Sequence, residues 1–213
     1  MIKTALMNSF LKADLSQKPY THWILSDVLP DEVAREFADF PIHTPEEVNY
    51  DIGTRASNNA IRGHFGPSRL AICPLCVDLA TAFQDEDVVK TIEKVCDVDL
   101  SGTYLRIEYA QDRDGFWLEP HTDLGVKKFT MLIYLSDDEG SEKWGTSIYS
   151  DKDNFVYDSP YACNLALVFV PSDDTWHGYE PRKMEGVRKS LIVNYVTDEW
   201  RSREELSFPN QPI

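Results

Sequence analysis

Long apolar runs are missing from this sequence, and so is any excess of positive charge. No stretch approaches the roughly 18 consecutive apolar residues of a transmembrane helix, so we expect no membrane partner. Lysine and arginine together number 21 against 36 aspartates and glutamates, which gives a net charge of −15. A field of that sign repels polyanions, so we expect no nucleic-acid partner either.

Cysteine is scarce, with four residues in a chain of 213. Cys73 and Cys76 have the C-x-x-C spacing of a redox or zinc motif, but no second such pair accompanies them. Reduced thiols in a cytoplasmic protein are the simpler interpretation. Residues 1–7 carry one charge and no long apolar core, so we expect no secretory leader and predict a cytoplasmic location.

The first part of the chain has the spacing of helices. Apolar residues recur every three to four positions in predicted helices at 31–40, 74–83 and 85–95, after a short predicted strand at 23–28. Residues 41–68 are rich in glycine, proline and polar residues, which predicts a long irregular segment. Segments of this kind in compact domains are often lids over sites.

From residue 100 onward, short runs of β-forming residues alternate with turn residues. We predict eight strands, at 102–110, 116–121, 128–135, 146–150, 155–157, 165–170, 175–179 and 188–196. This spacing fits a double-sheet jelly roll of the cupin kind better than an immunoglobulin-like sandwich. The expected fold class is therefore mainly β with flanking helices (α+β), a double-stranded β-helix with the N-terminal helices packed on one sheet. A chain of this length is most simply one domain, with residues 1–99 as helical support and lid, 100–197 as the jelly-roll core and 198–213 as a tail.

Three residues have the character of metal ligands. His121 and Asp123 stand two positions apart, and alternate side chains of a strand share a face, so both can point at one metal ion. His177, 54 residues beyond Asp123, offers a third ligand. Each signal is weak alone, and the combination carries the prediction. Two imidazoles and one carboxylate leave three octahedral positions open, as an Fe(II) centre needs for an organic cosubstrate and dioxygen.

The order of these motifs resembles a known family. The chain resembles the Fe(II)/2-oxoglutarate-dependent oxygenases in having His-x-Asp first, then His177, then Arg188-x-Ser190. The surrounding sequence is similar to the prolyl-4-hydroxylase-like branch of that family. The segment 105–109 followed by Pro120-His121 resembles the strand that leads into the metal motif of that branch. Residues 129–135 resemble its next core strand. The resemblance covers residues 100–197 well and the segment 23–40 loosely.

The resemblance implies a role for each of these residues. His121, Asp123 and His177 would be the catalytic iron ligands. Arg188 would form a bidentate ion pair with the distal carboxylate of 2-oxoglutarate, and the Ser190 hydroxyl would add a hydrogen bond. A buried dianion needs a fixed cation, because an unpaired carboxylate in an apolar barrel is very costly. Further contacts with the cosubstrate are implied for three residues, Tyr134, Tyr109 and Thr130.

Several residues near the motif strands have two interpretations. Arg106 and Lys189 lie either on an exposed strand face or against a substrate anion, because a register slip of one residue exchanges the two faces. Trp117, Trp144 and Trp176 either line a substrate pocket or lie in the core.

The implied activity is hydroxylation of an unactivated C–H bond, with succinate and CO₂ as co-products. Fe(II) and 2-oxoglutarate are the implied cofactors, dioxygen is the co-reactant and ascorbate is a candidate reductant. The small size of the chain favours a small metabolite or amino acid as substrate. A peptidyl residue, as in prolyl hydroxylation, is one alternative. A cupin-type metal-binding protein or isomerase without oxygen chemistry is another, although it would have no use for Arg188 and Ser190. The sequence does not predict the oligomeric state.

Overall fold

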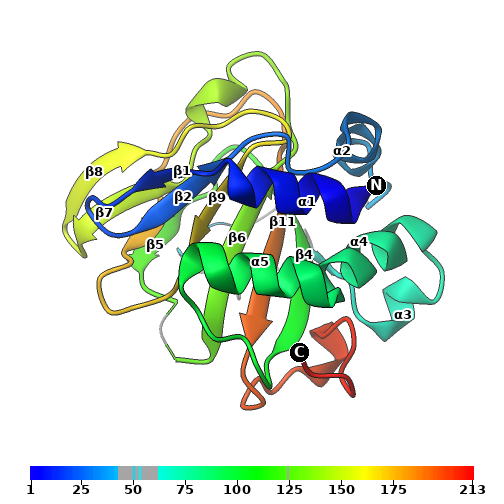
Figure 1. Cartoon of the computed structure of the whole chain (residues 1–213). Coiled ribbons are helices and arrows are strands. Elements are labelled where there is room, and N and C mark those ends of the chain that lie inside the picture. Colours follow the sequence, from blue (N-terminus) through cyan, green and yellow to red (C-terminus); the bar gives the residue numbers. More distant parts are fainter. Residues whose placement is uncertain (43–49, 51–52, 54–61, 124) are drawn as a thin grey trace.

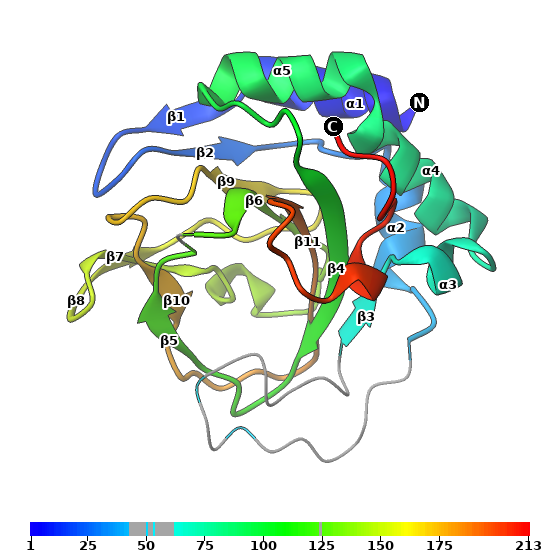
Figure 2. The same ribbon diagram turned by 90° about the horizontal axis from the view of Figure 1, so that it is seen from below.

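Two antiparallel sheets face each other in the computed structural model, which describes residues 1–42, 50, 53, 62–123 and 125–213 (Figures 1 and 2). The larger sheet has seven strands in the order β1-β2-β9-β6-β11-β4-β3, and the smaller has four in the order β5-β10-β7-β8. This arrangement confirms the expected jelly roll with flanking helices. Most of the lid predicted for residues 41–68 lies outside the described residues.

The strands follow the predicted positions closely. Those of the larger sheet are β1 (Asp14–Ser16), β2 (His22–Leu25), β3 (Arg62–His64), β4 (Tyr104–Asp112), β6 (Lys127–Tyr134), β9 (Ala166–Phe169) and β11 (Arg188–Val196). Those of the smaller sheet are β5 (Leu118–His121), β7 (Ser147–Asp151), β8 (Asn154–Asp158) and β10 (His177–Tyr179). The predictions missed β1 and β3, because strands of three residues are too short to show an alternating pattern.

Helices cover the outer face of the larger sheet. They are α1 (Ile2–Leu11), α2 (Asp31–Ala38), α3 (Pro67–Leu70), α4 (Pro74–Gln84) and α5 (Glu86–Cys96). Two short 3₁₀ turns, η2 (Ser141–Lys143) and η3 (Arg203–Glu205), lie in connections elsewhere in the chain. The predictions missed α1 and α3. In α1 the signal was present, because Ile2, Leu6 and Phe10 recur every four residues and are all buried. None of the described helices has the length and apolar content needed to cross a membrane.

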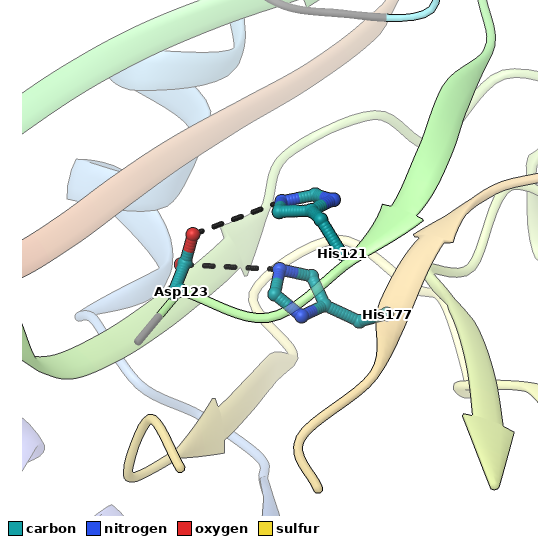
Figure 3. A group of neighbouring side chains, drawn as sticks. All are labelled: His121, Asp123 and His177. Atoms are coloured by element: carbon teal, nitrogen blue, oxygen red, sulfur yellow. Dashed lines mark ion pairs between the residues drawn. The ribbon is translucent and has the colours of Figure 1, made fainter. Parts of the chain in front are cut away.

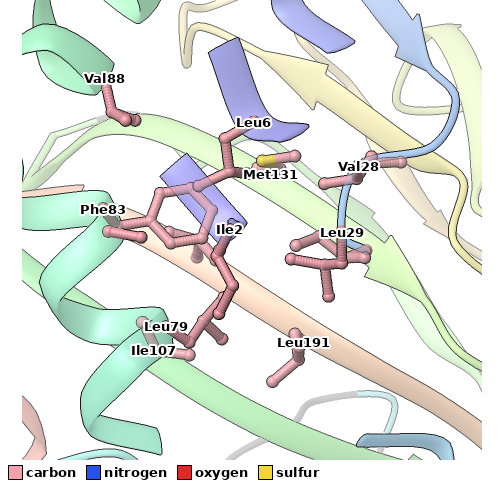
Figure 4. Close-up of a cluster of buried hydrophobic side chains, with 14 of the residues drawn as sticks. Ile2, Leu6, Val28, Leu29, Leu79, Phe83, Val88, Ile107, Met131 and Leu191 are labelled. Carbon is pink, nitrogen blue, oxygen red and sulfur yellow. The ribbon is translucent and has the colours of Figure 1, made fainter. Parts of the chain in front are cut away.

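The main hydrophobic core lies between these helices and the sheet (Figure 4). Ile107 of β4, Met131 of β6 and Leu191 of β11 point outward into it, against Leu6 of α1 and Phe83 of α4. Their strand neighbours face the other way, because side chains alternate along a strand. The helices therefore hold one face of the sheet rigid, and the opposite face is left to line the space between the two sheets.

Candidate metal centre and cosubstrate pocket

Three side chains converge between the two sheets (Figure 3). His121 ends β5 and His177 begins β10, and the two residues are directly opposite in the β5–β10 pair. The Nε2 atom of His121 lies 3.7 Å from Asp123 Oδ1, and the Nε2 atom of His177 lies 3.8 Å from Asp123 Oδ2. Ligands held about 2.1 Å from an octahedral ion lie about 3 Å from one another, so the three side chains, whose ligand atoms lie within 4.8 Å of one another, would move closer together on binding one ion.

The position of Asp123 differs from the expectation in one respect. It lies beyond the end of β5, in the connection to β6, so strand alternation does not explain why it shares a direction with His121. Its neighbours hold it instead. Lys127 Nζ lies 2.7 Å from its Oδ1, and the Thr130 hydroxyl donates to its Oδ2 at 3.0 Å. Burial of Asp123 opposes its ionisation, but Lys127 and His177 outweigh burial and hold its pKa below the usual range. The group is therefore a carboxylate, the form that binds metal.

Both imidazoles are oriented by backbone carbonyls. His121 Nδ1 lies 2.8 Å from the Glu119 carbonyl, and His177 Nδ1 lies 2.9 Å from the Thr175 carbonyl. A proton on Nδ1 makes each of these contacts a hydrogen bond, which leaves the lone pair on Nε2, the atom that faces Asp123. Burial, helped by His121, lowers the pKa of His177 to about 3. His177 is therefore neutral at ordinary pH, as a ligand must be.

The three residues open onto a cavity of about 420 Å³, within the range of small-molecule sites. Leu132 of β6 and Ile192 of β11 form an apolar wall, and Tyr179 of β10 faces them from the smaller sheet. Arg188 lines the same cavity. The structure thus places the candidate metal ligands and the candidate cosubstrate cation around one cavity.

Arg188 is 1% exposed and is held from several sides. Its Nη1 donates to Asp112 at 2.8 Å, its Nε to the Trp144 carbonyl at 2.7 Å and its Nη2 to the Thr146 hydroxyl at 3.2 Å. Its guanidinium carbon lies 4.8 Å from the ring centre of Tyr179. Burial by itself would lower the pKa of Arg188, but Asp112 and the neighbouring tyrosines together raise that pKa above its usual value. The sequence did not indicate this partner.

Ser190, Tyr134 and Thr130 lie on the inner face of the sheet. The buried Ser190 hydroxyl, two residues along β11 from Arg188, has no hydrogen-bond partner among the residues that the structure describes. The Tyr134 hydroxyl is engaged by the hydroxyls of Thr146 and Ser159, and its ring lies 5.5 Å from the Arg188 guanidinium. Both therefore lie near Arg188, whereas Thr130 contacts Asp123.

Tyr109 is not part of this group. On β4, alternation places Tyr109 on the opposite face from Arg106, and the Tyr109 side chain packs among the helices. Its hydroxyl donates to the Phe37 carbonyl at 2.8 Å, and its ring lies 5.4 Å from Phe40. The expectation that Tyr109 contacts the cosubstrate is therefore corrected, and we leave it out of the site.

We expect Tyr109→Phe to affect stability and not cosubstrate binding. The variant loses one buried hydrogen bond, so the free energy of unfolding should fall by about 1 kcal/mol, which chemical denaturation measures. The KM for 2-oxoglutarate should stay within twofold of the wild type. A tenfold rise in that KM would return Tyr109 to the site.

Of the residues that had two interpretations from the sequence, some line the cavity and others do not. Arg106 is buried on the inner face and lines the cavity, whereas Lys189 projects from the outer face of β11 and contacts the Ala38 carbonyl. None of the three tryptophans considered from the sequence lines the cavity in the part of the chain that is described, namely Trp117, Trp144 and Trp176. Trp200, which follows the last strand, does line it.

Other polar cavity residues were not predicted: Arg62, Glu108, Lys127 and Trp200. Glu108 had a signal, because it stands two residues from Arg106 in one strand and so shares its face. Arg62 begins the short strand β3, inside the segment 41–68 that was predicted to be irregular, where the sequence has no periodicity.

Comparisons with known proteins bear on the fold. No family model and no curated protein matches the sequence. A Pseudomonas putida prolyl-4-hydroxylase is 16% identical with a TM-score of 0.59, over 92% of this chain and 99% of that one. A Trichoplax adhaerens prolyl hydroxylase, solved with a hypoxia inducible factor peptide fragment, is 13% identical with a TM-score of 0.57, over 92% and 90%. The viral collagen prolyl hydroxylase of Paramecium Bursaria Chlorella virus-1, a 2-oxoglutarate complex, is 13% identical with a TM-score of 0.57, over 83% and 96%. The chain therefore has the fold of the prolyl-4-hydroxylase-like Fe(II)/2-oxoglutarate oxygenases, as the sequence resemblance implied.

Proposed function

We propose that the protein is an Fe(II)- and 2-oxoglutarate-dependent dioxygenase that hydroxylates an unactivated C–H bond of a small metabolite or amino acid, with succinate and CO₂ as co-products. One observation carries the proposal. The candidate ligand atoms of His121, Asp123 and His177 lie within 4.8 Å of one another, and Arg188 lines the same cavity. Dioxygen is the co-reactant, and ascorbate is a candidate reductant.

The donor set fits Fe(II). Two neutral imidazoles and one carboxylate match the two-histidine, one-carboxylate ligation of non-haem iron, and each imidazole is oriented by a carbonyl on its far nitrogen. Iron bound there would supply the redox chemistry with dioxygen that decarboxylates 2-oxoglutarate and oxidises the substrate. Lys127 and Thr130 keep the Asp123 carboxylate ionised and fixed in direction.

The inner face of β11 fits 2-oxoglutarate. Arg188 offers a cation at one end of the cavity, and Ser190 a hydroxyl without a partner among the described residues. Leu132 and Ile192 would exclude water from the chain of the cosubstrate. A cupin-type isomerase would need the metal ligands but not a buried guanidinium beside them. We therefore favour the oxygenase.

Peptidyl hydroxylation remains the alternative substrate class. The Trichoplax adhaerens neighbour was solved with a peptide fragment, and the fold of this chain suits that class equally well. The size of the cavity, about 420 Å³, favours a small molecule. The cysteines in the described part of the chain are free thiols, which agrees with our proposal of a cytoplasmic location.

The oxygenase proposal predicts a spectroscopic signature. Anaerobic addition of 2-oxoglutarate to the Fe(II) protein should produce a weak visible charge-transfer band, because the 2-oxoacid end chelates the metal. Succinate, which lacks the keto group, should produce none and serves as the control. Admission of air should then convert 2-oxoglutarate to succinate. If neither the band nor succinate formation is seen, the oxygenase assignment fails.

A further inference from the structure

We propose that the primary substrate carries a carboxylate, and that Arg62 and Arg106 bind it. The inference rests on the proposed function, because it concerns the substrate side of the same cavity. Both arginines line that cavity, and each side chain is 8% exposed. Between them lies Glu108, which forms ion pairs with both.

The two arginines lie away from the cosubstrate cation. Along β4 and β11, Asp112 is opposite Arg188, and Arg106 is opposite Asn194. Six residues of a strand separate the two pairs, on the order of 20 Å. Asn194 belongs to the metal end, because its amide donates at 3.0 Å to Thr130, which in turn contacts Asp123. An anion at Arg106 would therefore lie beside the metal ligands and leave Arg188 to the cosubstrate.

Stability does not account for this cluster. Removing buried charges from water is costly, and replacing a buried ion pair by apolar residues of similar volume is often neutral or stabilising. Arg106 is also held rigidly: its Nε donates to Glu205 at 2.7 Å, and its guanidinium carbon lies 4.8 Å from the Trp200 ring. A guanidinium fixed in this way offers a defined plane to an incoming carboxylate, which would share its donors with Glu108 and Glu205. This is the arrangement expected of a binding site.

The cavity wall around the cluster is rich in charged side chains. Arg62, Arg106 and Lys127 line this end, against the buried carboxylates Glu108 and Asp123. Glu119 also lines the cavity, but it is exposed. Three basic residues thus gather on one wall of a chain with a net charge of −15, beside three acidic ones.

Trp200 supplies an independent observation. Its indole N–H is buried and has no acceptor among the described residues, although the side chain lines the cavity beside Arg106. A buried donor without a partner is destabilising, and an incoming carboxylate oxygen would supply the missing acceptor. The main chain of a peptide has no formal charge and would leave both arginines without a new counter-ion. The chemistry of the site therefore selects a carboxylate.

Carboxylate binding can be tested without iron or 2-oxoglutarate. The chain has five tryptophans, so protein labelled with 5-fluorotryptophan should give five ¹⁹F resonances, and Trp200→Phe identifies one of them. Addition of butyrate to tens of millimolar should shift the Trp200 resonance. Butyramide, of the same shape but neutral, should not. Arg62→Gln, on the edge strand, should raise the apparent Kd for butyrate at least tenfold.

Two further variants complete this test. Arg106→Lys keeps the charge but loses the planar fork, so it should also weaken butyrate binding at least tenfold. Arg201→Gln, an exposed arginine next to Trp200 in the chain, is the matched control and should bind butyrate as the wild type does. No butyrate shift, an equal shift with butyramide, or unchanged Kd in both cavity variants would overturn the proposal. Since the probe needs neither cofactor, these results are independent of the oxygenase test.

Turnover assays then show whether the carboxylate belongs to a free small molecule or to a peptide. Succinate formation should be compared for free amino acids, their carboxamides, and end-blocked peptides with and without an acidic side chain. We expect carboxylates to stimulate turnover and their amides not to, and Arg62→Gln to raise the KM for the acid at least tenfold with the KM for 2-oxoglutarate unchanged. Stimulation by free acids alone would identify a small-molecule substrate, and by acidic peptides alone a peptidyl one. Equal stimulation by neutral peptides or amides would overturn the inference.

Discussion

Replacement of Asp123 by alanine should abolish iron binding and 2-oxoglutarate turnover while the fold is retained. The variant removes the only carboxylate among the three candidate ligands, and we expect metal affinity to fall by more than about 100-fold, beyond the loss from removing an outer contact. The fold should tolerate the change because Asp123 lies in a connection between strands. Its partner Lys127 has a side chain 23% exposed that can turn to water, so the free energy of unfolding should change by about 1 kcal/mol.

Iron content after anaerobic reconstitution and desalting measures this effect, and circular dichroism during heating measures the fold. His177→Ala should behave in the same way. Asp173→Ala removes an exposed acid elsewhere in the chain and should keep full iron content and turnover. Iron retained at the wild-type level in both ligand variants would reject the metal centre. Unfolding of both would indicate that the three residues serve the structure instead.

The strands that carry the site were the most predictable part of the fold. The predicted bounds of β11 agree with the structure at both ends, and its β-forming residues from Leu191 to Val196 stop before polar residues. The faces of β4 were not predictable. Nearly all of its residues are buried, on the helix side as well as the cavity side, so no alternation of polar and apolar residues marks an exposed face. Arg106 and Tyr109 stand three residues apart and cannot share a face, yet only the packed structure shows which of them faces inward.

The metal ligands could be predicted from their spacing, whereas the substrate side of the cavity could not. His121, Asp123 and His177 form a recurrent pattern, and the structure brings them together even though Asp123 lies outside the strand. Arg62 and Trp200 come from segments without periodicity, on either side of the core in sequence. What brings them together is the pairing of β3 with β4 and the return of the chain after β11, which are long-range contacts without a local signal.

The buried ion pair with Asp112 gives Arg188 a role in the fold in addition to its proposed role in cosubstrate binding. Both side chains are 1% exposed and lie opposite each other on neighbouring strands. Removal of one partner leaves the other charge in the interior without this ion pair, which costs about 3–5 kcal/mol. Loss of cosubstrate binding in an Arg188 variant would therefore not by itself demonstrate a contact with 2-oxoglutarate, because the pocket itself would be disturbed.

We expect Arg188→Ala to lower the free energy of unfolding by about 3–5 kcal/mol and to abolish the 2-oxoglutarate charge-transfer band. The double variant Arg188→Met/Asp112→Val removes both charges and keeps apolar volume, so it should recover most of the stability without recovering the band. Urea denaturation and anaerobic titration of the iron protein measure the two effects separately. If the double variant regains both stability and the band, Arg188 serves only the fold. If stability returns and the band does not, the guanidinium itself binds the cosubstrate. The double variant has no buried carboxylate left without its ion pair, so a disturbed pocket would not explain the loss of the band.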